Sequence, residues 1–140
     1  MLSISDTVER QPSIWEQLGG TDGGATEVFT ELVDRFYAGV ITDPVIRPMY
    51  PDEDMDGARE RLALFLIQYF GGPTIYSDQR GHPRLRMRHS PYRIDTTVAD
   101  AWLLHMNSAL TAVAALQPHL DTMQAYFTYT AYFMRNSEDH

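Results

Sequence analysis

Apolar residues recur at a helical period along most of this 140-residue chain. The most regular run lies within residues 26–40, where the apolar side chains fall on one wide stripe: Val28, Phe29, Leu32, Val33, Phe36, Tyr37 and Val40. A period of about 3.6 residues is typical of an amphipathic helix whose stripe packs on a core. Strand alternation and hairpin dipeptides are absent from the sequence. The pattern therefore predicts an all-α fold.

Three more segments carry an apolar helical stripe, at about residues 55–70, 97–116 and 118–135. Two short helices are also expected. One follows Ser13, which forms a capping box with Glu16, and the other covers residues 84–89 between two prolines. The run 71–83 is predicted to be a loop, and a loop of this length in a compact helical domain is often functional.

The length fits one domain. We expect a polar N-terminal tail over residues 1–12, a domain over 13–136 and a C-terminal tail over 137–140. The net charge of −8 argues against nucleic acid or an anionic membrane as the main partner. Neither a signal-peptide pattern nor an apolar run of membrane-spanning length is present, so we expect a cytoplasmic protein.

The composition also limits the chemistry. Cysteine is absent, which excludes disulfides, thiolate catalysis, zinc–thiolate sites, iron–sulfur clusters and covalent haem attachment. The run D-x-D-x-D-G at residues 52–57 matches the first half of a calcium loop, but Ala63 stands where such a loop needs a bidentate glutamate. We interpret these carboxylates instead as residues that complement the dipole at a helix N-terminus.

The stretch Arg80–Ile94 gathers five of the chain's eleven basic residues around His89. A histidine on a short, fixed element can present one ring nitrogen as a ligand or can be structural, and the residues alone leave both readings open. No second histidine or carboxylate stands at zinc spacing from it, which disfavours a zinc enzyme. Haem supplies four equatorial nitrogens of its own and needs only one protein ligand. The arginines would then pair with its carboxylates, or they form an ordinary solvated face.

Three aromatic residues with polar tips, Tyr37, Tyr50 and Trp102, fall at or near apolar positions. Buried tyrosine and tryptophan side chains need partners for their O–H and N–H groups. These residues would form a polar cap inside an apolar cavity, or they belong to an ordinary aromatic core.

Four separated runs resemble the truncated haemoglobins of the globin superfamily, and within them group II, the O type. They are FYAGVITDPVIRPMYP (36–51), ERLALFLIQYFGGP (60–73), RGHPRLRMRHSPYRI (80–94) and DAWLLHM (100–106). The resemblance covers residues 13–136 and follows the family's order and spacing. It implies a truncated globin fold, a two-over-two helical sandwich around a non-covalent haem b.

The resemblance also implies roles for single residues. His89 would be the proximal iron ligand, and Tyr37, Tyr50 and Trp102 would form the distal cage. Ala58 stands where many globins carry a distal histidine. The resemblance implies two further groups of haem contacts. The apolar contacts would be Leu62, Phe65, Leu66 and Met87. The candidates for hydrogen bonds and ion pairs with the propionates are Arg61, Tyr76, Arg84 and Arg88, with His82 behind them.

The function implied is reversible and tight binding of O2, together with other diatomic gases such as CO and NO. The alternative is a redox enzyme, a nitric oxide dioxygenase or a peroxidase-like protein, which would need an external reductase as partner. The chain could also assemble as a homodimer. The chain departs from the family at two places. Thr21–Gly24 looks like an insertion, and Phe70 stands where tryptophan is expected.

Overall fold

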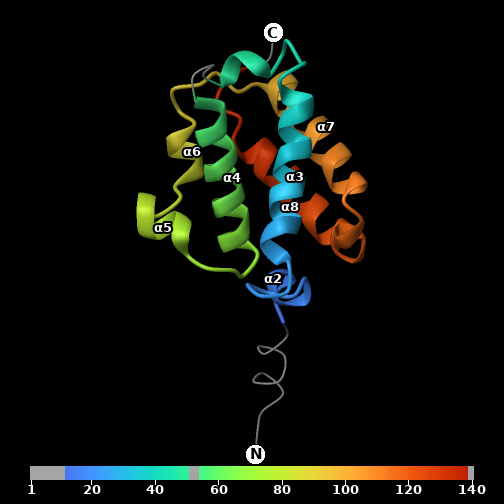
Figure 1. Cartoon of the computed structure of the whole chain (residues 1–140). Helices are drawn as coiled ribbons and strands as arrows, with labels where there is room; N and C mark the ends of the chain where they lie inside the picture. Colours follow the sequence, from blue (N-terminus) through green and yellow to red (C-terminus); the bar gives the residue numbers. More distant parts are fainter. Residues whose placement is uncertain (1–11, 51–53, 139–140) are drawn as a thin grey trace, which may run out of the picture.

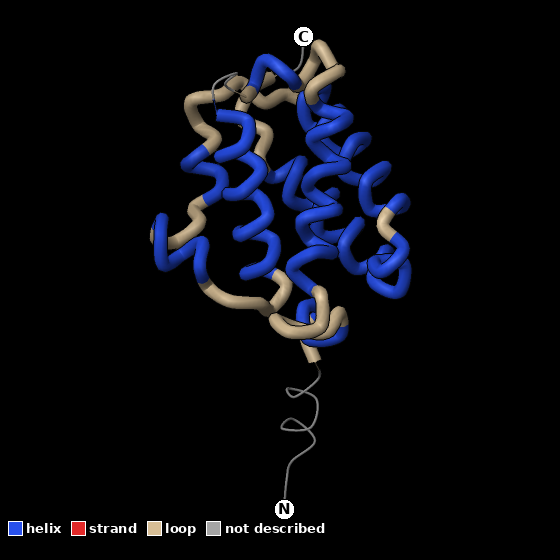
Figure 2. Tube along the Cα trace, viewed as in Figure 1, coloured by secondary structure: helices blue, strands red, loops and turns tan. Residues whose placement is uncertain are grey.

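The computed structural model describes residues 12–50 and 54–138, and the regular elements among them are all helical (Figure 2). The elements in chain order are α2 (Ile14–Gln17), α3 (Ala25–Val40), η1 (Arg47–Met49), α4 (Met55–Tyr69), α5 (Ile75–Arg80), α6 (Leu85–Arg88), α7 (Thr96–Ala112), η3 (Ala114–His119) and α8 (Leu120–Phe133). The predicted all-α class is confirmed for these residues. Except for Pro12, the predicted tail 1–12 lies outside the described residues, as do Asp52 of the calcium-like run and residues 139–140.

Four long helices form two pairs, α3 with α4 and α7 with α8 (Figure 1). α3 also packs against α7, which joins the two pairs. The side chains between them are fully buried: Phe29, Leu32, Phe36, Leu66, Met106, Leu110, Met123 and Phe127. The predicted two-over-two helical sandwich is therefore confirmed. Within the described part of the chain, no helix combines the length and the apolar character needed to cross a bilayer.

The N-terminal residues close one end of the sandwich. Ser13 caps α2 as predicted, since its Oγ accepts a hydrogen bond from the backbone N–H of Glu16 at 3.1 Å. The backbone N–H of Trp15 donates to the carbonyl of Phe70 at 3.0 Å and ties α2 to the end of α4. Phe70 is buried and stacks on Phe29 with 6.0 Å between ring centroids. Phenylalanine thus fills this position with a well-packed ring.

The segment Thr21–Gly24 closes as a compact turn before α3. Gly19, at a φ of 109°, and Gly23 approach so closely that a Cβ on either would collide with the backbone of the other. Glycine is needed at both positions for this reason. The segment therefore folds back on itself directly before α3.

The predicted loop 71–83 is wrong in its middle, because Ile75–Arg80 forms the helix α5. Two hydrogen bonds from Gln68 of α4 fix this helix. Its Oε1 accepts from the backbone N–H of Ser77 at 2.9 Å, and its Nε2 donates to Ser77 Oγ at 2.7 Å. Tyr76 is buried and meets Phe65 edge to face at 5.5 Å. Contacts distant in sequence thus stabilise a six-residue helix that periodicity could not indicate.

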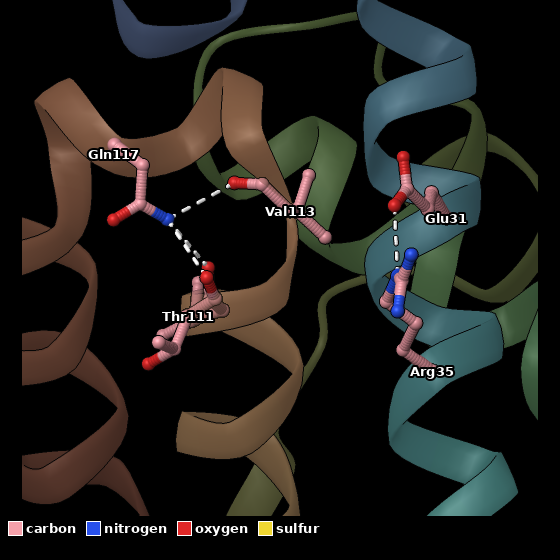
Figure 3. Close-up of polar contacts among 6 residues, drawn as sticks. Glu31, Arg35, Thr111, Val113 and Gln117 are labelled. Atoms are coloured by element: carbon pink, nitrogen blue, oxygen red, sulfur yellow. Dashed lines mark hydrogen bonds and ion pairs between the residues drawn. The ribbon is translucent and has the colours of Figure 1, made fainter.

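The boundary between the last two long helices also differs from the prediction. α7 ends at Ala112, the 3-10 helix η3 follows, and α8 begins at Leu120. Gln117 holds this corner, because its Nε2 donates to the carbonyls of Leu110, Thr111 and Val113 at 3.1–3.3 Å (Figure 3). The Leu110 and Val113 carbonyls also accept backbone hydrogen bonds, from the N–H groups of Val113 and Leu116, so Gln117 adds a second donor to each.

The outer face of α3 is solvated. On it Arg35 Nε donates to Glu31 Oε2 at 2.7 Å, and both side chains are about half exposed (Figure 3). Such a pair, four residues apart on one helix, contributes about 0.3–0.5 kcal/mol. The opposite face of the same helix is the one that forms the core and the site described next.

Candidate functional site

A cavity of about 370 Å³ lies among the helices, with walls from α3, η1, α4, α5, α6, α7 and α8. Its volume falls in the range of sites that bind small molecules and cofactors. Eleven of the residues singled out in the sequence line it: Tyr37, Tyr50, Ala58, Arg61, Leu62, Phe65, Leu66, Tyr76, Arg88, His89 and Trp102. Residues from four separate sequence runs therefore meet at one place.

Three other predicted residues do not line the cavity. Met87 is 57% exposed, and Arg84 and His82 are exposed as well. Arg84 begins α6 in the left-handed region at a φ of 43°, and its backbone N–H donates to His82 Nδ1 at 3.3 Å. Met87 precedes His89 by two residues and Arg84 by five, whereas residues three or four apart share a helix face, so neither lies on the face of His89.

His89 is the C-cap of α6 and is half-buried. Its Nδ1 lies 2.7 Å from the carbonyl oxygen of Leu85. A carbonyl only accepts, so Nδ1 carries the proton and the lone pair is left on Nε2. The side-chain amide of Asn136 donates to the carbonyls of His89 and Tyr92, which holds the backbone on either side of Ser90. An imidazole oriented by one backbone hydrogen bond is a common arrangement for a metal ligand.

Tyr37, Tyr50 and Trp102 form one hydrogen-bonded chain, although they come from α3, the end of η1 and α7. The rings of Tyr37 and Tyr50 meet edge to face at 5.4 Å. The Trp102 indole can only donate, so its N–H donates to the Tyr50 oxygen, and Tyr50 in turn donates to Tyr37. The chain ends at the Tyr37 hydroxyl, whose own proton is not used within the trio.

Burial governs the acidity of both tyrosines. Loss of water around the hydroxyl raises the pKa of Tyr37 to about 12, although the bond from Tyr50 and the nearby guanidinium groups of Arg61 and Arg59 lower it. Burial raises the pKa of Tyr50 as well, and the proton that it donates to Tyr37 raises it further. Both hydroxyls therefore stay protonated at neutral pH and act as hydrogen-bond donors.

Three arginines line the cavity, Arg61 from α4, Arg80 from α5 and Arg88 from α6. Arg88 is held by the backbone, since Nε donates to Pro83 O and Nη2 to Arg80 O, each at 2.6 Å. Its guanidinium carbon lies 6.0 Å from the centroid of the Tyr76 ring. Arg61 pairs with Asp54 at 3.1 Å. Positive charge in the lining of an apolar cavity suits a ligand that carries carboxylates.

Sequence reasoning missed several lining residues. They are Leu85 of α6, Val98 and Ala99 of α7, Tyr126, Phe127, Thr130 and Ala131 of α8, and six residues outside these three helices, Ile46, Met49, Arg80, Tyr92, Ile94 and Met134. Helical spacing could have suggested Leu85 and Val98, which lie one turn before His89 and Trp102. The stripe on α8 was recognised as apolar, but periodicity does not tell which neighbour an apolar face meets.

The cavity offers one histidine as a metal ligand. Across residues 12–50 and 54–138, no three His, Asp or Glu side chains stand close enough together to hold a metal ion. A metal bound beside His89 would therefore have to bring most of its ligands with it.

The family model for bacterial-like globins matches residues 13–136. The group 2 truncated hemoglobin YjbI of Bacillus subtilis (strain 168) is 42% identical over 62% of this chain and 65% of its own length. The group 2 truncated hemoglobin 3-1 of Lotus japonicus is 30% identical over 94% of the chain and 74% of its own length. The crystal structure of a thermostable hemoglobin from Thermobifida fusca is 52% identical, with a TM-score of 0.80 over 89% of this chain and 98% of that one. The chain thus spans just under two thirds of the Bacillus subtilis relative.

Proposed function

This chain belongs to the bacterial-like globins, as a group II truncated haemoglobin, and from that premise we propose that it binds O2 reversibly and tightly at a haem b held by His89. Membership of the family makes it a haem protein that binds diatomic gases. The further proposal concerns which residues hold the haem and which act on the gas. The observation that carries it is one cavity that holds both an oriented histidine and a chain of three hydrogen-bonding aromatic residues.

The cavity suits haem in three respects. Its lining is mostly apolar, with Leu62, Phe65 and Leu66 of α4 available to contact a flat macrocycle. His89 would hold the iron through Nε2, because Nδ1 is engaged by the carbonyl of Leu85. Arg61 and Arg88, with Arg80, would pair with the two propionates. Haem b is the form proposed because the chain has no cysteine for covalent attachment.

When bound, haem supplies an iron atom that takes up diatomic gases and places electron density on their outer atom. The protein would supply hydrogen-bond donors to that outer atom. The Tyr37 proton is the one left free by the chain Trp102–Tyr50–Tyr37, so Tyr37 is the first donor available to the gas. Ala58 also lines the cavity, where its side chain is small and buried.

The donors would slow the release of O2. A hydrogen bond to a charged acceptor contributes about 1.5–3 kcal/mol. Since about 1.4 kcal/mol is a factor of ten, one such bond slows dissociation about ten- to a hundredfold. Tight binding of this kind suits storage or chemistry on the gas better than transport.

The test is the visible spectrum of the purified protein after reconstitution with haemin. We expect a Soret band that shifts with reductant, O2 and CO. We also expect His89→Ala to lose the proximal signature and to regain it with added imidazole. His119→Ala is the matched control, because His119 lies outside the cavity lining. No Soret band, or one unchanged in His89→Ala, would contradict the proposal.

The alternative is a redox enzyme that acts on nitric oxide or peroxide with the same residues. It requires an external reductase, which is a further proposal about partners. The two functions differ in turnover. Repeated consumption of nitric oxide in the presence of a reductase would favour the enzyme, and a single stoichiometric reaction would favour the oxygen-binding protein.

A further inference from the structure

The segment that follows α8 is hydrogen-bonded to the segment that carries His89. Asn136 lies three residues beyond the end of α8, and its side-chain amide makes three hydrogen bonds to backbone groups of residues 89–94. Nδ2 donates to the carbonyl of Tyr92 at 2.8 Å and to that of His89 at 3.3 Å, and Oδ1 accepts from the N–H of Ile94 at 2.8 Å. One side chain therefore spans the turn that follows the histidine.

The orientation of this amide is fixed by its neighbours. Two donors face Oδ1, the N–H of Ile94 and the hydroxyl of Ser137 at 3.1 Å, whereas two carbonyl oxygens face Nδ2. A carbonyl oxygen only accepts, so the reversed amide would lose its bonds to all three backbone groups. An asparagine at position 136 thus makes a set of bonds that neither aspartate nor an aliphatic residue can reproduce.

Backbone bonds join the same two segments. The N–H groups of Asn136 and Ser137 both donate to the carbonyl of Ile94, at 2.9 and 3.2 Å. Ile94 is buried and lines the cavity. Arg86 and Arg93 add side-chain bonds to carbonyls of the C-terminal segment, at 3.3 and 2.9 Å. The residues after α8 and those around His89 therefore form one hydrogen-bonded unit at the cavity wall.

His89 needs support from outside its own helix. α6 has four residues and no side-chain cap at its start, and a helix of this length is not stable alone. The imidazole is oriented through Nδ1 by the carbonyl of Leu85, one turn earlier in α6. Arg88 ties this helix to two backbone carbonyls that precede it. On the C-terminal side, the side chain of Asn136 holds the His89 carbonyl itself.

We infer that Asn136 is a positioning residue for His89, which fixes the direction of Nε2 and thereby the strength of the iron–histidine bond. The inference rests on the proposed haem site. Asn136 does not line the cavity, so its effect on the iron passes through the backbone of the ligand. Groups that orient a metal ligand from outside the ligand set commonly change metal affinity about 10–100-fold.

The experiment compares haem-reconstituted wild type with Asn136→Ala. Resonance Raman spectra of the ferrous protein without added gas give the iron–histidine stretching band, and transfer to an acceptor protein gives the rate of haem loss. We expect the band of Asn136→Ala to be broader and lower in frequency, because a loosened imidazole meets the iron in several directions. Haem loss should be about tenfold faster. Asn136 is exposed, so its replacement leaves no cavity in the core.

Two further variants separate positioning from general support of the fold. Gln117→Ala removes an amide that also donates to three backbone carbonyls, but it lies between α7 and α8 and outside the cavity lining. It should keep the wild-type Raman band and rate of haem loss, even where it lowers stability. Asn136→Asp keeps an acceptor for the N–H of Ile94 but loses both donors, so it should resemble Asn136→Ala.

Amide hydrogen exchange provides a readout that does not depend on the iron. The N–H of Ile94 should exchange faster in Asn136→Ala, which lacks the acceptor, and should stay protected in Asn136→Asp. With this amide protected, a shifted Raman band in Asn136→Asp assigns the effect to the lost bonds at His89 and Tyr92.

A wild-type Raman band and rate of haem loss in Asn136→Asp would overturn the inference, because the bond to Ile94 would then suffice. An equal shift in Gln117→Ala would also overturn it, since lost stability would explain both. The Soret band of each variant is recorded first. A normal Soret band with an unchanged iron–histidine band in Asn136→Ala refutes this inference and leaves the oxygen-binding proposal standing. Absence of the Soret band in the wild-type protein refutes both.

Discussion

The imidazole of His105 lies directly against the Cα of Gly39, so close that a Cβ at position 39 would collide with Nδ1. On its other side the same ring meets Asp43, with 2.6 Å between Nε2 and Oδ2. Gly39 belongs to α3 and His105 to α7, so this contact joins the two helix pairs. His105 is half-buried, and Asp43 gives its ring a hydrogen-bond partner.

Gly39→Ala should destabilise the protein. In a helix interior, alanine normally stabilises by about 0.5–1 kcal/mol relative to glycine. Here the added methyl must displace His105, and such overpacking costs about 1–3 kcal/mol. Denaturant unfolding measures the difference, with Ala38→Ser, at the exposed neighbouring position, as control. An increase in stability would show that His105 moves aside without cost.

The Asp43–His105 pair should contribute to the acid sensitivity of the fold. The hydrogen bond from His105 holds the pKa of Asp43 below its ordinary value of 3.8, helped by the bond from the backbone N–H of Val45. A carboxyl whose pKa is lowered by folding stabilises the native state above its unfolded pKa, and this contribution is lost as the pH falls through the folded pKa.

Asp43→Asn should therefore show a shallower loss of unfolding free energy than wild type as the pH is lowered below about 4. The measurement is a series of denaturant curves across that range. Asp22→Asn, in the exposed turn before α3, is the control and should follow wild type. Parallel curves for Asp43→Asn and wild type would contradict the expected role.

Trp102→Phe should release O2 faster, by up to about tenfold, because it removes a neutral hydrogen bond that supports the donor to the gas. The variant removes the N–H that donates to Tyr50 and leaves the chain from Tyr50 to Tyr37 without its first donor. Stopped-flow dissociation measures the rate. Trp15→Phe is a matched control, because Trp15 is buried but packs against Phe29 away from the cavity lining. An unchanged rate in Trp102→Phe would show that the indole does not contribute to the retention of O2.

Arg88→Gln should lose haem faster than wild type. Arg88 is fixed by two short hydrogen bonds to backbone carbonyls and lines the cavity, so its charge is held where a propionate would lie. Loss of a charge-assisted hydrogen bond costs about 1.5–3 kcal/mol, or about tenfold or more in the rate of haem transfer to an acceptor protein. Arg86→Gln is the control, since Arg86 is exposed and outside the lining. Equal rates for the two variants would contradict a propionate role for Arg88.

The long helices could be predicted because their signals are local. The stripe of α3 is buried as expected apart from Val28, which is half-buried, and Asp95 caps α7 through a 3.0 Å bond from the backbone N–H of Val98. α5 could not be predicted, because its support comes from Gln68 on another helix. Arg84 and Met87 were assigned to the cofactor by resemblance, but both side chains are exposed and neither lines the cavity. Their contact with haem therefore has no support from the described geometry.

The close approach at Gly39 has a practical consequence for protein engineering. His105 follows Trp102 by almost one turn of α7, so the ring resting on Gly39 helps to set the rotation of that helix and hence the direction of the indole. Gly39 itself does not line the cavity. Oxygen affinity could thus be adjusted by remote substitutions along the seam between α3 and α7, with every cofactor-facing side chain left as it is.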